Sequence, residues 1–278
     1  ESTLHYDDDL SEPTDGLDLS HLQLGDVRIQ CADLLYQGRW MKAHLAECSF
    51  TEKSGLMVNA LTGDLESDST VIRLPQLLLQ TPHSEAKLTA LIPWNSLEER
   101  PKEEMRVTWE SRLGKADLLF AMGELPDDFV RAYPSQPLTL NVEAEGNLAA
   151  MRLTKGEMRL PGAFQMALSG QMEAVMDSVK RTGELRMEAE TDSLNFLLTM
   201  LPVEERLFYN LPKGMRLQGE AFVANQAYQA ELHFREDKGK IDLTAHYDPT
   251  QEAYQVALQV DSLEPVHFMP LDSLYSLT

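Results

Sequence analysis

The chain has 278 residues, of which 43% are hydrophobic and 25% charged, a balance that excludes disorder as the default state. Its formal net charge of -21 argues against partners that carry dense negative charge, namely nucleic acids and anionic membrane surfaces. No apolar run approaches the roughly 20 residues that a transmembrane helix needs. We therefore expect a folded chain with apolar, neutral or basic partners and no nucleic acid.

The predicted elements begin after an acidic segment. Residues 1–16 show little apolar periodicity, which predicts a flexible, solvated leader. Cys31 and Cys48 then flank the turn-like sequence YQGRW, and a hairpin centred near Arg39 would let them face each other. Two interpretations stay open: a disulfide, which requires an oxidising compartment, or two small buried thiols.

From Leu17 onward most of the chain alternates apolar and polar residues with the period of two that strands show. In TVIRLPQLLLQ the apolar positions change parity at Pro75, which predicts a β-bulge or a strand break. The clearest meander consists of YQAELHF, KIDLTAHY and AYQVALQV, joined by the turn-rich sequences REDKGK and DPTQE. About 17 strands are expected from this alternation.

Helical signals are few and short. The best are PDDFVRAYP at 126–134 and the segment 192–212, which Pro202 interrupts. So few helices cannot cover the apolar face of so large a sheet, and a large exposed apolar surface marks a binding surface. The predicted fold class is therefore mostly β: a long, curled antiparallel sheet with a few short helices between repeat units. Such a sheet must close on itself, pack on another sheet or hold something apolar.

A weak internal repeat supports a modular organisation. Leu125, Leu194 and Leu263 each open a short segment that is rich in Leu or contains Phe and runs to a Pro, and they are spaced 69 residues apart. Units stacked end to end are typical of repeat proteins. We expect a first module at 17–124 and further repeats over 125–278, with units starting near 125, 194 and 263.

The sequence contains none of the common catalytic or cofactor signatures: no G-x-S-x-G, no G-x-x-x-x-G-K-[ST], no G-x-G-x-x-G and no H-E-x-x-H. It therefore predicts a protein that is not an enzyme and that needs neither a cofactor nor a metal. Only three Trp are present, which disfavours a carbohydrate-binding module with aromatic platforms. Thirteen Met indicate either ordinary core filling or an adaptable lining for a greasy partner.

The segment SGLMVNALTGDLESDSTVIRLPQLLLQTPHSEAKLTALIP resembles the TamB proteins of Bacteroidetes, within the wider AsmA-like group. The ending GKIDLTAHYDPTQEAYQVALQVDSLEPVHFMP is similar to a pattern that recurs in this family, and the resemblance extends over most of the chain from about Leu17. It implies a location in the periplasm of the cell envelope, within a longer protein that is anchored in the inner membrane. It also implies a repeating β-groove, or β-taco, whose concave apolar face carries phospholipids or other acyl-chain lipids.

The resemblance implies a second role as well. In it, the protein is a scaffold that pairs strands with an outer-membrane barrel of the BamA or TamA type during barrel assembly. A scaffold needs free strand edges, whereas lipid transport needs an open apolar trough.

The candidate lipid-contacting residues are apolar members of the alternating strands. Burying one CH₂ contributes about 0.8 kcal/mol, so a lipid laid along several strands would be held without any single specific contact. The alternative for each residue is the core of a closed β-sandwich. The candidates are Ile72, Leu74, Leu77, Leu79, Leu88, Ile92, Leu138, Leu140, Val142, Phe164, Met166, Leu168, Leu185, Met187, Leu232, Phe234, Ile241, Leu243, Val256 and Leu258.

Overall fold

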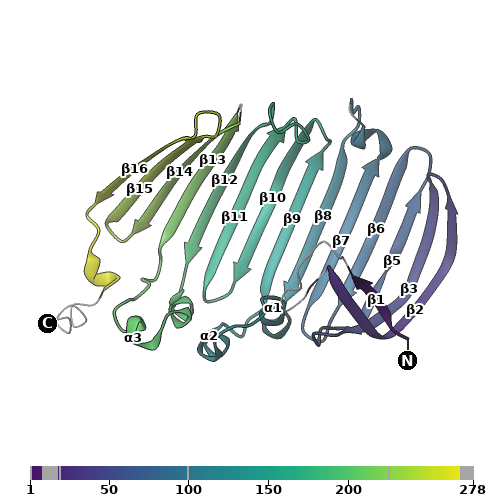
Figure 1. Ribbon diagram of the computed structural model, residues 1–278, viewed down its shortest axis with the longest axis horizontal. Coiled ribbons are helices and arrows are strands. Elements are labelled where there is room, and N and C mark those ends of the chain that lie inside the picture. Colours follow the sequence, from purple (N-terminus) through teal and green to yellow (C-terminus); the bar gives the residue numbers. More distant parts are fainter. Residues whose placement is uncertain (1, 8–17, 19, 99, 225, 270–278) are drawn as a thin grey trace. The chain divides into compact units, whose positions relative to one another are not determined.

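The computed structural model describes residues 2–7, 18, 20–98, 100–224 and 226–269 (Figure 1). Its strands form one 16-stranded antiparallel sheet that is not closed, and they follow one another in sequence order except that β4 pairs with β3 alone. The prediction of a mostly β fold with few, short helices is confirmed.

The strands are β1 (Leu4–Asp7), β2 (His21–Gln37), β3 (Trp40–Glu52), β4 (Met57–Val58), β5 (Ala60–Ser67), β6 (Val71–Gln80), β7 (Glu85–Pro93), β8 (Met105–Leu113), β9 (Leu138–Gly146), β10 (Ala150–Leu160), β11 (Phe164–Glu173), β12 (Thr182–Thr191), β13 (Arg216–Ala224), β14 (Ala227–Glu236), β15 (Gly239–Asp248) and β16 (Ala253–Asp261). The helices are η1 (Trp94–Leu97), α1 (Lys115–Ala121), α2 (Asp127–Ala132), η2 (Asn195–Met200), α3 (Val203–Arg206) and η3 (Pro265–His267), of which η1, η2 and η3 are 3₁₀.

The chain divides into two compact units. Unit 1 comprises residues 1–125 and 135–141, and unit 2 comprises residues 126–134 and 142–278. Strands β1 to β8 belong to unit 1 and β10 to β16 to unit 2, whereas β9 has residues in both. Within unit 2 the four strands β13 to β16 lie between helical segments that begin at Asn195 and Pro265.

The N-terminal segment differs in part from the predicted leader. Leu4–Asp7 form β1, which pairs with His21–Leu24 of β2, and Asp7 lies 3.4 Å from the Nε2 atom of His21. The alternation of Leu4 and Tyr6 with polar residues is enough for a strand because β2 supplies the ladder partner. Residue 1 and residues 8–16 of the predicted leader lie outside the described residues.

Cys31 and Cys48 are free thiols, which corrects the disulfide interpretation. The β2–β3 hairpin forms as predicted, but its register shifts next to Cys31. Because the hairpin turns between Gln37 and Trp40, Cys31 lies opposite Leu45 and Cys48 lies opposite Ile29. A disulfide requires two cysteines whose Cβ atoms face each other about 3.5–4.5 Å apart, and this register does not bring them together.

We expect both cysteines to react with iodoacetamide in the native protein without prior reduction. Cys31 is exposed, whereas burial raises the pKa of the Cys48 thiol. Because the thiolate is the reactive form, Cys31 should be alkylated faster than Cys48 at a pH of about 8. Mass spectrometry of peptides over a time course measures both rates. Thiols that stay blocked until a reductant is added would contradict the observed register.

Strand β6 carries the predicted bulge. Its register against β7 shifts by one residue between Leu74 and Leu77, on either side of Pro75. Pro has no N–H to donate, so a ladder interrupted there loses no hydrogen bond. The extra residue keeps Ile72, Leu74, Leu77 and Leu79 on one face of the sheet, although the sequence parity changes between the two pairs.

Both predicted helical segments are present. The segment 126–134 contains α2, and the segment 192–212 contains η2 and α3, separated at Pro202. The sequence missed α1, whose seven residues are too short to show two helical turns of apolar periodicity. No helix in the described part of the chain is long and apolar enough to cross a membrane.

Fully buried side chains of unit 2 gather near the ends of strands. Leu160 and Ala163, at the β10–β11 turn, are 1% and 0% exposed, and Met215 lies just before β13. Phe129 of α2 and the adjacent Tyr133 are buried as well. Figure 1 shows α2 and α3 beside the strand ends rather than along the strands. The helices therefore do not cover the middle of the sheet.

Candidate functional site

In unit 2, apolar residues line up in rows that cross strands β10 to β16. Directly opposed residues of antiparallel strands project from the same face of a sheet, so each row stays on one face. We call this side the apolar face, and none of its row residues is charged. The rows are Met151, Met172, Gly183, Val223, Tyr228, Tyr247, Tyr254; Leu153, Gly170, Leu185, Ala221, Ala230, Ala245, Val256; Gly156, Leu168, Met187, Gly219, Leu232, Leu243, Leu258; and Met158, Met166, Ala189, Leu217, Phe234, Ile241, Val260.

The residues that the sequence singled out in β11 to β16 all lie on this apolar face. Alternation within one strand fixes which residues share a face, and the pairing register connects one strand to the next. The residues are Phe164, Met166, Leu168, Leu185, Met187, Leu232, Phe234, Ile241, Leu243, Val256 and Leu258.

The remaining candidates lie in β6, β7 and β9. In unit 1, Ile72 and Leu77 oppose Ile92 and Leu88, and the alternating positions Leu74 and Leu79 share their face. In β9, Leu138, Leu140 and Val142 alternate in step with Ala144, which contacts the hollow on the apolar face of unit 2. Each unit thus carries its own set of candidates on one strand face.

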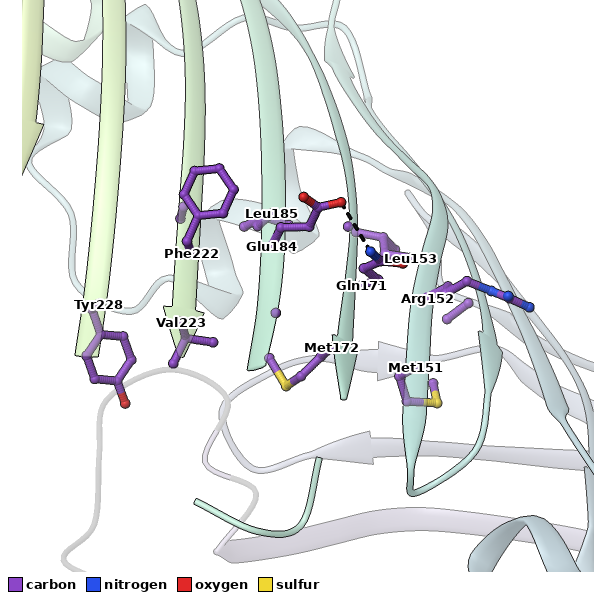
Figure 2. A pocket seen from close by; sticks show the side chains of 14 residues that line it. Met151, Arg152, Leu153, Gln171, Met172, Glu184, Leu185, Phe222, Val223 and Tyr228 are labelled. Carbon is purple, nitrogen blue, oxygen red and sulfur yellow. Dashed lines mark hydrogen bonds between the residues drawn. The ribbon is translucent and has the colours of Figure 1, made fainter. Parts of the chain in front are cut away.

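A hollow of about 410 Å³ lies on the apolar face of unit 2 (Figure 2). This volume falls within the range of about 300–1,000 Å³ that is usual for small-molecule sites. Arg152, Gln171, Glu184 and Phe222 also border it, but they occupy the alternate positions, and Figure 2 shows the hydrogen bond that joins Gln171 to Glu184. The apolar-face lining consists of Ala144, Met151, Leu153, Gly170, Met172, Gly183, Leu185, Ala221, Val223 and Tyr228.

Two glycines leave bare backbone within the hollow. A Cβ atom added to Gly170 would lie 2.4 Å from the carbonyl oxygen of Glu184, and one added to Gly183 would lie 2.8 Å from that of Gln171. Such distances are too short for real Cβ atoms, so the close approach of β11 and β12 requires glycine at both positions. Alternation of apolar and polar residues does not reveal them, because a glycine within an alternating strand does not count as apolar.

The apolar face is substantially exposed to solvent. Leu185 is 42% exposed and Tyr228 is 50% exposed, whereas the core residues at the strand ends are nearly inaccessible. Single exposed apolar residues are common on protein surfaces, but contiguous apolar patches mark binding sites. The rows are contiguous across seven strands, which makes this face the candidate functional site.

The opposite face of unit 2 is polar and charged. Arg186 lies 3.5 Å from both Glu184 and Glu220, and His233 lies 2.6 Å from Asp242. Surface pairs of this kind contribute only about 0–1 kcal/mol each. These charged groups keep this face hydrated. A hydrophobic partner can therefore contact only the other face of the sheet.

Three aromatic rings hold α2 against η2. The Phe129 and Phe196 ring centroids are 5.8 Å apart, and those of Tyr133 and Phe196 are 5.4 Å apart. Tilted or edge-to-face rings at such distances attract one another by about 0.5–1.5 kcal/mol beyond the area that they bury. This aromatic cluster joins the start of unit 2 to the segment that follows β12.

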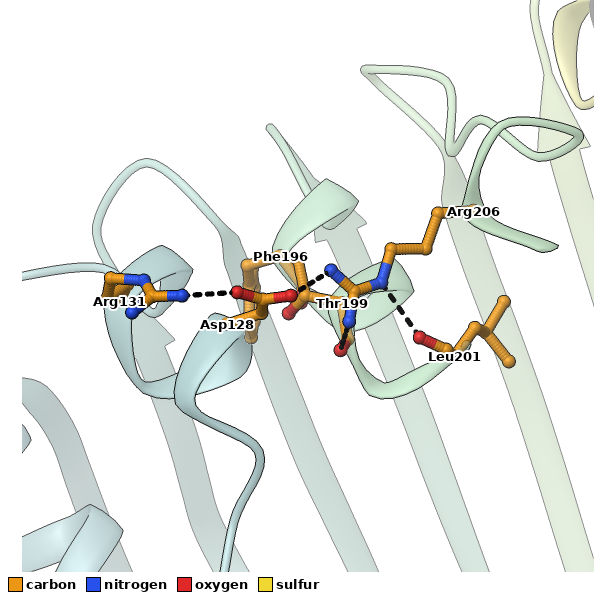
Figure 3. Close-up of polar contacts among 6 residues, drawn as sticks. All are labelled: Asp128, Arg131, Phe196, Thr199, Leu201 and Arg206. Atoms are coloured by element: carbon orange, nitrogen blue, oxygen red, sulfur yellow. Dashed lines mark hydrogen bonds and ion pairs between the residues drawn. The ribbon is translucent and has the colours of Figure 1, made fainter. Parts of the chain in front are cut away.

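Charged groups join the same two segments (Figure 3). The Asp128 carboxylate accepts hydrogen bonds from Arg131 and Arg206. Arg206 also donates to the carbonyl oxygens of Leu201 at 2.8 Å and Thr199 at 2.9 Å. These two hydrogen bonds to the end of η2 hold its guanidinium in place. The hydrogen bond from Arg206 and the pairing with Arg131 hold the pKa of Asp128 below its usual range.

Replacing Asp128 by Asn is expected to destabilise unit 2 at neutral pH but not at low pH. A carboxylate whose pKa is lowered by folding contributes stability above its unfolded pKa of about 3.9, and the contribution is lost as the pH falls through the folded value. Urea midpoints of wild type and Asp128→Asn measured at several pH values should converge as the pH falls below about 3.9 and through the folded pKa of Asp128. A difference that does not change with pH would contradict the role of the charge.

Unit 1 contains a smaller hollow of about 160 Å³ beside α1. The hydroxyl groups of Thr81 and Ser84 both donate to the carboxylate of Asp117, and the amide of Gly114 donates to the Ser84 hydroxyl. These contacts tie the start of α1 to the β6–β7 turn. Among the described residues, no group of three or more His, Cys, Asp or Glu is arranged to hold a metal ion.

The apolar face of unit 2 is thus a feature of the described residues whose chemistry local packing does not explain. Comparison of the chain with protein-family models, with curated proteins and with solved structures found no match.

Proposed function

We propose that the apolar face of unit 2 shields the acyl chains of lipids, and that the chain is the periplasmic part of a TamB/AsmA-like protein that carries phospholipid or another acyl-chain lipid between the inner and outer membranes. One observation carries the proposal: the four uncharged rows that cross β10 to β16, most of whose residues are partly or fully exposed. The resemblance in sequence supports the envelope location.

The dimensions of the rows suit an acyl chain. Seven strands spaced about 4.8 Å apart give each row a length of roughly 29 Å, and half of a bilayer's hydrocarbon core is about 15 Å thick. An acyl chain laid along a row therefore finds apolar contacts over its whole length. Each methylene that it buries contributes about 0.8 kcal/mol.

None of the residues in the four rows carries a charge that would bind a headgroup. The expected selectivity is accordingly for acyl chains in general, with the headgroup left in water. In the hollow, Gly170 and Gly183 leave the backbone uncovered by side chains, and Met151 and Met172 line its sides. Methionine side chains fit ligands of variable shape because they are unbranched and polarisable.

Site-specific photocrosslinking tests the proposal directly. A benzophenone amino acid placed at Leu185 lies on the apolar face, and one placed at Ser169 lies on the polar face one strand away. In an envelope-bearing bacterial host we expect crosslinks to lipid from position 185 and none from position 169. Equal crosslinking from both positions, or none from either, would contradict the proposal.

The second candidate function, a scaffold for outer-membrane β-barrel assembly, is favoured by one observation. Among the described residues, strand β16 is the last in the strand order of the sheet, and all its residues are exposed. A partner strand would add to that edge through main-chain hydrogen bonds. Crosslinks from β16 to a barrel protein, without lipid crosslinks from Leu185, would favour this function over lipid transport.

A further inference from the structure

Hydroxyl groups occur in only one of the four rows on the apolar face of unit 2. They belong to Tyr228, Tyr247 and Tyr254, which lie side by side on β14, β15 and β16. The other three rows consist of aliphatic residues, Met, Gly and one Phe. The two ends of these strands therefore differ: the apolar face carries hydroxyl groups at one end and none at the other.

Tyr228 and Tyr247 form a stacked pair, which we call the tyrosine pair. They are directly opposed in the β14–β15 ladder, with 6.3 Å between ring centroids and an angle of 23° between the rings. Both side chains are about half exposed, and no described residue hydrogen-bonds to either hydroxyl group. Figure 2 shows Tyr228 beside Val223 at the edge of the hollow. Both hydroxyl groups can therefore donate to a ligand on the apolar face.

The row at the opposite end contains Phe234 and Ile241, and these residues are more sheltered. They are directly opposed and half-buried. Phe268, which follows η3, packs against Phe234 with 6.2 Å between ring centroids. A ligand with one polar and one apolar end thus finds a hydrated end beside the tyrosine pair and a sheltered apolar end beside Phe234.

The distance between these two ends suits one acyl chain. Tyr228 and Phe234 lie six residues apart on β14, which at about 3.4 Å per residue separates them by roughly 20 Å. The acyl chains of one bilayer leaflet span about 15 Å. Apolar contacts alone would let an acyl chain lie in any direction on this face, whereas the tyrosine pair distinguishes one end of the strands from the other.

The local charge indicates which polar group the tyrosine pair would bind. The segment from Asp248 to Glu252, directly after Tyr247, contains two carboxylates and no Lys or Arg. An anionic phosphate or carboxylate is disfavoured there, whereas an ester carbonyl is an uncharged acceptor for a phenolic hydroxyl. We propose, on the basis of the lipid-shielding function proposed above, that the tyrosine pair donates hydrogen bonds to the ester carbonyl of an acyl lipid. The acyl chain then runs along β14 and β15 towards Phe234.

Two single-chain lipids test the role of the hydroxyl groups. Palmitoyl lysophosphatidylcholine and its hexadecyl ether share headgroup and chain length, and only the first has the ester carbonyl. In equilibrium dialysis below the micelle concentration, the wild-type chain should bind the ester about fivefold more tightly, the ratio expected for one neutral hydrogen bond. The double variant Tyr228→Phe, Tyr247→Phe should bind both lipids as the wild-type chain binds the ether, because Phe keeps the ring. The matched control is Tyr209→Phe, an exposed tyrosine of unit 2 outside the four rows, which should keep the preference.

A photoreactive lipid tests the direction of the acyl chain. The same ester with a diazirine at its methyl end should, on irradiation, label Phe234, Ile241 and their neighbours, as read by tandem mass spectrometry. Labels centred on Val223 would mean that the chain runs in the opposite direction and would overturn the proposal.

The binding results separate the tyrosine pair from the lipid-shielding function. Equal binding of ester and ether by the wild-type chain, or an ester preference that persists in the double variant, would overturn the role of the tyrosine pair while leaving acyl-chain shielding intact. A wild-type chain that binds neither lipid would contradict the lipid-shielding function and the tyrosine proposal together.

Discussion

Replacing Leu185 by Glu is expected to remove bound lipid from the purified chain while leaving its β-sheet circular dichroism unchanged. Leu185 is 42% exposed and borders the hollow, so a hydrated carboxylate at this position is compatible with the folded sheet. Covering that carboxylate with an acyl chain would cost several kcal/mol in desolvation. At about 1.4 kcal/mol per factor of ten, lipid affinity should fall by roughly two orders of magnitude.

The matched control is Ser169→Glu. Ser169 is exposed on the polar face opposite Arg186, next in sequence to Gly170, so this variant adds the same charge without touching the apolar face. It should retain lipid like the wild-type chain. A large uncharged side chain introduced by Ala221→Trp should displace lipid by filling the hollow. Unfolding of the Leu185→Glu variant, with lipid retention intact in Ala221→Trp, would identify the face as a core rather than a groove.

Replacing Phe129 by Ala is expected to cost about 3–5 kcal/mol of local stability. Phe129 is 3% exposed and its ring contacts those of Tyr133 and Phe196, so truncation leaves a cavity that the neighbouring segments cannot easily fill. Hydrogen exchange followed by mass spectrometry reports the local opening free energy. Peptides that span 126–134 and 192–212 should lose most of their protection.

The adjacent Val130 provides the control for this change. It is 37% exposed, and Val130→Ala should alter protection by no more than about 0.5 kcal/mol, as most surface substitutions do. If Phe129→Ala left the exchange of residues 192–212 unchanged, the aromatic cluster would not hold the two segments together.

Alternation within single strands made much of the fold predictable. Strands with one apolar face, such as Tyr228 to Phe234, can be recognised from the sequence, because residues two positions apart lie on the same face of a sheet. The bulge at Pro75 was predictable for a similar reason: a parity switch beside a residue without an N–H has few other interpretations. These signals are local, and they placed the candidate residues of each strand on a common face.

Features that depend on long-range register were not predictable. The rows of the apolar face arise from the pairing of seven strands, and the hollow requires glycines whose role appears only when neighbouring backbones approach. The contact between Asp128 and Arg206 joins residues 78 positions apart. The disulfide interpretation was wrong because the β2–β3 turn lies nearer the N-terminus than a Cys31–Cys48 pairing requires: Gln37 pairs with Trp40, and Cys48 therefore meets Ile29. Such a small displacement of a turn leaves no clear trace in the sequence.

Native mass spectrometry of the 278-residue chain, purified from an envelope-bearing host and combined with lipid extraction, tests the lipid groove most directly. The apolar face predicts a population that carries phospholipid or another acyl-chain lipid, present in the Ser169→Glu variant and absent in Leu185→Glu. Protein free of lipid in all three samples would contradict lipid shielding by this face.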